Sequence, residues 1–232
     1  HDGKVFTPDK FIDVFEENGF IMQLDEYIWE YVCSLIRKWL DEGRTVVPVS
    51  VNVSRLDIYN KNLRGVLNGL VKKYGLSRDL LRLEITETSY MQDPEQLIGV
   101  VRQLREDGFF IEMDDFGSGY SSLNTLKDVV VDMLKLDMRF ISSAEAEGRS
   151  GIILSAIVRM SYGLNIPVIA EGVETSQQAD FLRDIGCVIA QGYLYARPMS
   201  VKDFEELLMA GNTGDINDAI RTEMRPYRGE NK

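Results

Sequence analysis

Residues 111–123 read IEMDDFGSGYSSL, and the interpretation of the whole chain starts from this stretch. An apolar, strand-like run over residues 109–114 ends in two adjacent carboxylates, Asp114 and Asp115, and two glycines then mark a turn. Neighbouring acids at the end of a buried strand repel each other and lose hydration. Such a pair is tolerated if the two acids share a proton, meet a cation or bind a metal.

Strand-like and helix-like segments alternate on both sides of this stretch. This alternation predicts a parallel sheet with right-handed crossover helices. The expected strands are residues 46–53, 81–86, 109–114, 133–136, 168–170 and 188–190, and the expected helices are residues 8–18, 21–41, 63–74, 94–107, 147–164, 176–185 and 201–209. We expect one domain over residues 1–210, followed over residues 211–232 by a tail with at most one short helix.

The composition excludes several classes of protein. A net charge of −11 argues against a nucleic-acid polymer as partner and against a basic membrane-surface protein. The only histidine is His1, which excludes Ser-His-Asp and Cys-His catalysis and makes a zinc site improbable. We expect Cys33 and Cys187 to be buried free thiols. With no apolar run of about 18 residues, the prediction is a cytoplasmic domain, on its own or as the cytoplasmic part of a larger or membrane-anchored protein.

Polar residues end all six expected strands. In a parallel α/β barrel these ends meet at one rim, where the active site lies. Oxygen donors without histidine or thiolate suit Mg²⁺, Mn²⁺ or Ca²⁺, and adjacent aspartates suit a two-metal site for in-line displacement at phosphorus. Lys135 could orient the attacking water or stabilise charge. The residues, in strand order, are Asn52; Glu84 with Glu87; Asp114 and Asp115; Lys135 and Asp137; Glu171 with Glu174; and Gln191.

Each of these residues has an ordinary structural explanation when it is taken alone. Asp114 and Asp115 could cap a turn, Lys135 and Glu171 could form a structural ion pair, and Glu84 could face solvent. We favour a shared site because the separate explanations would bring the polar residues to one rim by coincidence.

Six short motifs follow one another in order along the chain. They are SVNVSR (50–55), LEITET (83–88), MDDFGSGYSSL (113–123), LKLD (134–137), AEGVET (170–175) and QGYLYARP (191–198). In this order they resemble the EAL domain family of cyclic di-GMP phosphodiesterases. The segment PDKFIDVFEENGFI, residues 8–21, resembles the early helix of that family.

The resemblance implies a modified TIM-type (β/α)₈ barrel that hydrolyses cyclic di-GMP to linear pGpG in bacterial second-messenger signalling, with Mg²⁺ or Mn²⁺ in a two-metal site. It implies catalytic roles for Lys135 and Glu171 and a loop-stabilising role for Glu87. It also implies metal ligands at Asn52, Glu84, Asp114, Asp115 and Glu171, and substrate-side positions at Asp137, Glu174 and Gln191.

One departure concerns the motif that gives the family its name. Glu-Ala-Leu is absent, and the opening residues HDGK resemble the segment that follows it, so we expect the first two barrel strands and one metal ligand to be missing from this chain. The resemblance further implies a homodimer through the loop and helix after Asp115, and an upstream sensor or nucleotide-cyclase domain is compatible with it. The alternative function is a catalytically inactive cyclic di-GMP receptor or a dimerising regulatory module; the retained acids at Glu84, Asp114, Asp115 and Glu171 favour the enzyme.

Overall fold

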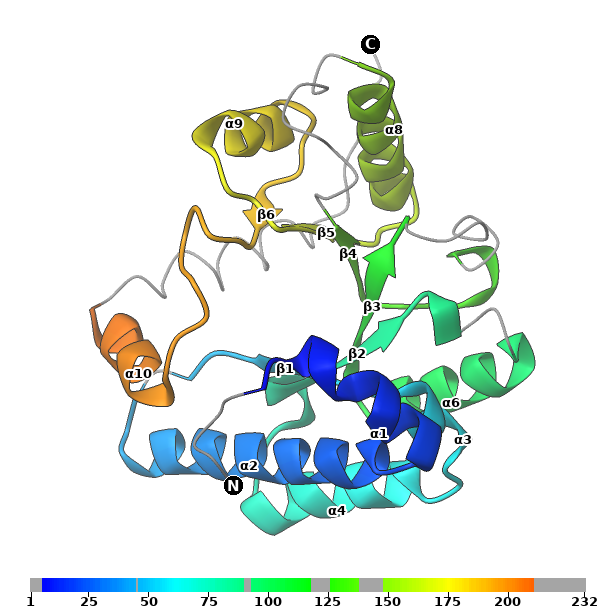
Figure 1. The fold of residues 1–232 in the computed structure, drawn as a ribbon, viewed down its shortest axis with the longest axis vertical. Coiled ribbons are helices and arrows are strands. Elements are labelled where there is room, and N and C mark those ends of the chain that lie inside the picture. Colours follow the sequence, from blue (N-terminus) through cyan, green and yellow to red (C-terminus); the bar gives the residue numbers. More distant parts are fainter. Residues whose placement is uncertain (1–5, 45, 90–92, 118–125, 138–147, 211–232) are drawn as a thin grey trace.

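The structure is a computed structural model that describes residues 6–44, 46–89, 93–117, 126–137 and 148–210. The expected tail over residues 211–232 lies outside these ranges, as does most of the loop after Asp115. The chain is drawn in Figure 1.

Six parallel strands form one sheet in chain order, which confirms the predicted α/β fold. The sheet curls, with helices on its outer side (Figure 1). Within the described ranges its ends are β1 and β6, each of which pairs with one neighbour. The strands are β1 (Val49–Asn52), β2 (Leu81–Thr86), β3 (Phe110–Phe116), β4 (Met133–Asp137), β5 (Val168–Glu171) and β6 (Ile189–Ala190).

The helices follow their sequence signals closely. The side chain of Thr175 caps α9 and that of Ser200 caps α10, each accepting a backbone N–H of the first turn. Gly19 ends α1 and Gly75 ends α4, both in the left-handed conformation that glycine adopts without strain. The described helices are η1 (Pro8–Lys10), α1 (Ile12–Asn18), α2 (Ile21–Asp41), α3 (Arg55–Tyr59), α4 (Leu63–Tyr74), η2 (Arg78–Leu80), α6 (Pro94–Glu106), α8 (Arg149–Gly163), α9 (Ser176–Asp184) and α10 (Val201–Met209).

Three local predictions need correction. The first expected helix is split into η1 and α1 at Phe11. The strand expected over residues 46–53 is only four residues long, because Pro48 precedes it and lacks the N–H that a ladder needs. The short helix α3 was not expected. Ser54 and Asp57 cap its first turn reciprocally, and this capping box is a short sequence signal for a helix of only five residues.

The two faces of the sheet differ in polarity, and this difference positions the site. Alternate side chains such as Leu83, Ile111 and Leu134 are buried in one apolar cluster with residues of α2, α4, α6 and α8. The intervening positions on the same strands carry polar groups, including Glu84, Glu112 and Lys135. The outer face therefore packs against the helices, and the inner face of the curl gathers the charged side chains.

Two further sequence predictions can be compared with the structure. Cys33 and Cys187 are buried free thiols, as expected. None of the helices in the described ranges has both the length and the apolar character needed to cross a bilayer.

Candidate active site

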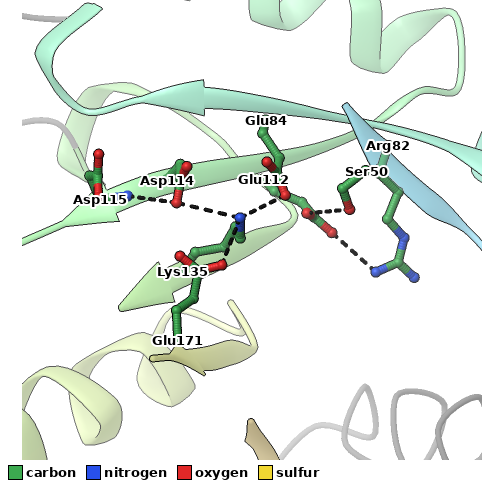
Figure 2. Close-up of polar contacts among 8 residues, drawn as sticks. All are labelled: Ser50, Arg82, Glu84, Glu112, Asp114, Asp115, Lys135 and Glu171. Carbon is green, nitrogen blue, oxygen red and sulfur yellow. Dashed lines mark hydrogen bonds and ion pairs between the residues drawn. The ribbon is translucent and has the colours of Figure 1, made fainter. Parts of the chain in front are cut away.

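Lys135 lies at the centre of a cluster of carboxylates on the inner face of the sheet (Figure 2). Its Nζ is 2.6 Å from Glu84 Oε1, 2.8 Å from Glu171 Oε1 and 3.4 Å from Asp114 Oδ1. The lysine is only 5% exposed. Four neighbouring strands, β2 to β5, each contribute one of these residues, so the parallel register brings together side chains that are distant in sequence.

The charges of this cluster do not balance. Burial disfavours the charged form of Lys135, but the charge of Glu84, the hydrogen bonds that the ammonium donates to Glu171 and Glu84, and the charge of Asp114 together raise its pKa. Burial raises the pKa of Glu84, against the opposing effect of Lys135. Burial also raises the pKa of Glu171 to about 7, although Lys135 opposes it. Three carboxylates around one ammonium leave two negative charges when all are ionised.

The end of β3 contains an irregularity at the two adjacent aspartates. The pairing of β3 with β4 shifts register between Met113 and Phe116, and Asp115 adopts a left-handed backbone with φ of 54°. The backbone N–H of Asp115 donates to Asp114 Oδ1 at 2.9 Å. The strand was expected to end at Asp114, but it continues through this bulge, which redirects the chain beside the site.

Glu87 joins the end of β2 to the end of β3. It is fully buried, and its Oε2 accepts the N–H of Gly117 at 3.0 Å. Its own N–H donates to the carbonyl of Asp114 at 3.1 Å. Gly117 has φ of 98°, where a side chain would be strained, so the glycine permits this turn.

The other predicted residues lie at or just after the C-terminal ends of their strands. Asp137 is the register partner of Glu171 across β4 and β5. The side chain of Asn52 is exposed, and the indole N–H of Trp29 donates to its carbonyl at 2.8 Å. Glu174 and Gln191 are exposed as well. The structure thus brings together Glu84, Asp114, Lys135 and Glu171.

The donor set suits a hard divalent cation, although it is not arranged as a preformed metal site. Among the described residues, no three His, Cys, Asp or Glu side chains are placed to hold a metal ion. The three carboxylates instead surround the ammonium of Lys135, so a positive charge already lies at the position to which they would attract a cation. Their oxygen donors and net negative charge suit a hard divalent cation in kind and in sign.

The sequence interpretation overlooked three polar residues beside this cluster. Glu112 is 3% exposed, and its carboxylate accepts a hydrogen bond from Ser50 Oγ at 2.8 Å and pairs with Arg82 Nη1 at 3.1 Å (Figure 2). The signal was present: each of the three precedes a predicted ligand by two residues, and strand residues two apart share a face.

Comparisons with known proteins identify the family of this chain. Residues 1–198 match the EAL domain family. The chain is 38% identical over 203 residues to the cyclic di-GMP phosphodiesterase NbdA of Pseudomonas aeruginosa, covering 88% of this chain and 26% of NbdA. It is 36% identical to the bifunctional diguanylate cyclase/cyclic di-GMP phosphodiesterase MucR of the same organism, covering 84% of this chain and 28% of MucR.

A solved structure of the PaMucR phosphodiesterase in complex with c-di-GMP superimposes with a TM-score of 0.79 at 35% identity, over 86% of this chain and 87% of that one. The chain spans about a quarter of the length of the two curated relatives. The matched motifs, the six-stranded parallel sheet and the superposition lead to one conclusion: this chain belongs to the EAL domain family.

Proposed function

We propose that this chain is the catalytic domain of a metal-dependent cyclic di-GMP phosphodiesterase that yields linear pGpG. The observation that carries the proposal is the convergence of Glu84, Asp114 and Glu171 on buried Lys135, in a chain whose relatives are named for this activity. A cyclic dinucleotide presents phosphodiester groups, and their hydrolysis requires an activated water and neutralised phosphoryl charge.

The residues would divide the reaction between them. Asn52, Glu84, Asp114, Asp115 and Glu171 would hold Mg²⁺ or Mn²⁺, which when bound lowers the pKa of water and neutralises the phosphate. Glu171 would take a proton from the attacking water. Lys135 would stabilise the charge that develops at phosphorus. Water attack breaks one P–O ester bond and opens the ring.

Supporting roles follow from position. Glu87 would keep the loop after β3 in its active shape through the N–H of Gly117. Asp137, Glu174 and Gln191 would face the substrate. We also propose a homodimer through the loop and helix after Asp115, although residues 118–125 lie outside the described ranges. A cytoplasmic location is proposed as well, and it is supported by the two buried free thiols.

The test is hydrolysis of cyclic di-GMP with Mg²⁺ or Mn²⁺ by wild type and by Asp114→Asn, each in a protein that also carries the first two barrel strands expected to be missing from this chain. We expect wild type to release linear pGpG and Asp114→Asn to lose at least about 100-fold in turnover, because the neutral amide cannot supply the negative charge of a metal ligand. Asp184→Asn, an exposed position on α9, is the matched control and should retain activity.

Other outcomes are informative. If wild type binds the dinucleotide without cleaving it, the protein is a receptor and not an enzyme. Asp114→Asn that cleaves as fast as wild type would show that this aspartate is not a metal ligand.

A further inference from the structure

A second polar group lies beside the proposed ligands on the inner face of the sheet. Glu112 of β3 is held on one oxygen by Ser50 of β1 and on the other by Arg82 of β2. Figure 2 shows this group next to Glu84, on the side away from Lys135. None of the three residues belongs to the proposed ligand or catalytic set.

The register makes Glu112 a direct neighbour of Glu84. The two residues are Cα partners across β2 and β3, and their side chains share the inner face. Arg82 lies on that face two residues before Glu84 on the same strand. Arg82 therefore shares the inner face with two carboxylates, Glu84 and Glu112, and it pairs with Glu112.

Arg82 has donor capacity that its present contacts do not use. Its guanidinium lies over the ring of Phe110, 4.4 Å from the centroid, and Nη1 reaches Glu112. In the part of the chain that the structure describes, its buried Nε has no hydrogen-bond acceptor. A guanidinium has five N–H donors and prefers paired carboxylates, so without Glu112 it would turn to Glu84.

We propose that Glu112 is a positioning residue of the phosphodiesterase site: it binds Arg82 and so keeps Glu84 free to hold the divalent cation. The inference rests on the proposed function. Its physical basis is competition, because an arginine and a divalent cation cannot both take the same carboxylate oxygens. Ser50 supports Glu112 by donating a hydrogen bond to its second carboxylate oxygen.

The test measures binding of Mn²⁺ alone by calorimetry, together with kcat and KM for cyclic di-GMP, on the protein that also carries the first two barrel strands. Glu112→Gln should weaken Mn²⁺ binding by at least about tenfold, since a neutral amide oxygen holds the Arg82 guanidinium more weakly than a carboxylate does and so releases it to Glu84. The double variant Arg82→Met/Glu112→Gln should restore affinity to within about threefold of wild type, because the competitor is gone. Glu106→Gln, exposed on α6, makes the same charge change and should leave binding unaltered.

A purely structural ion pair predicts a different pattern. Folded Glu112→Gln would then bind Mn²⁺ like wild type, and the double variant would be no better than the single one; either result overturns the inference. If circular dichroism shows that Glu112→Gln does not fold, Arg82→Met provides the test. It should bind Mn²⁺ at least as tightly as wild type. A tenfold loss of Mn²⁺ affinity would refute competition between Arg82 and the cation. Wild type that binds no Mn²⁺ would instead overturn the proposed function and the inference with it.

Discussion

Asp25 and Asp57 are two buried carboxylates that face each other behind the turn that follows β1. They come from α2 and α3 and are 5% and 1% exposed. Burial, then the hydrogen bond and the charge of Asp57, raise the pKa of Asp25 to about 8. Asp57 also accepts the N–H and hydroxyl of Ser54. The simplest arrangement is one proton held between the two acids at neutral pH.

This shared proton predicts how stability varies with pH. The folded chain keeps the proton up to about pH 8, whereas unfolded Asp25 loses it near pH 3.8. The contribution of Asp25 to the free energy of unfolding therefore falls as pH rises between these values. Asp25→Asn replaces the acid by an uncharged side chain of the same shape and should remove this decrease in unfolding free energy. Relative to wild type, it should gain at least about 1 kcal/mol in unfolding free energy between pH 5 and pH 8.

Urea denaturation at the two pH values measures the change. Asp13→Asn, an exposed acid on α1, is the control and should leave the pH dependence as in wild type. Parallel pH profiles for wild type and Asp25→Asn would show that the two acids do not share a proton.

At the scale of elements, α10 packs against the end of α2 that leads into β1 (Figure 1). Glu205 of α10 accepts hydrogen bonds from Lys38 Nζ at 2.8 Å and from the indole of Trp39 at 2.9 Å. The ring of Phe204 lies 5.9 Å from that of Trp39. Since α10 follows β6 and α2 precedes β1, this contact links the two ends of the open sheet.

The charge of Glu205 should therefore control how firmly α10 is held. Hydrogen bonds from Lys38 and Trp39 lower the pKa of Glu205 to about 2, so the carboxylate is ionised across the physiological range. Glu205→Gln should speed amide hydrogen exchange in α10 by about two- to fivefold and leave α8 unchanged. Glu206→Gln, exposed on the same helix, is the control. Equal exchange in the two variants would contradict an anchoring role.

At the scale of the whole molecule, the described sheet has two strands at its ends instead of a closed ladder. Open edges expose N–H and C=O groups that can pair with another chain. On β6 the N–H of Gln191 donates to Ala170, so by the alternation of a parallel ladder Ala190 directs its own N–H outward.

Proline at Ala190 should therefore block this edge without breaking the ladder. We expect wild type to self-associate as its concentration rises, and Ala190→Pro to reduce the associated fraction by roughly half or more at the same concentration. Sedimentation velocity measures this. Ile189→Pro, which removes an inward N–H, should instead destabilise β6. Equal association of wild type and Ala190→Pro would show that the β6 edge is not the contact.

Much of the fold follows from local patterns. Residues 21–41, 63–74 and 81–86 have the predicted bounds, because periodicity and flanking glycines or caps mark both ends of these elements. The bulge at Asp115 and the length of β1 were not predictable in this way. They depend on how neighbouring strands pair, and that is set by residues far away in the sequence.

The sequence by itself determined the family, the order of strands and helices, and the set of polar residues at the strand ends. Only the tertiary structure decided which of them meet: Lys135 gathers Glu84, Asp114 and Glu171, whereas Asn52, Glu174 and Gln191 lie apart from that cluster. It also revealed Glu112 with Arg82, and Asp25 with Asp57. The reason is physical: a residue's chemistry is local, but its charge balance depends on neighbours that parallel register and burial bring within a few ångströms.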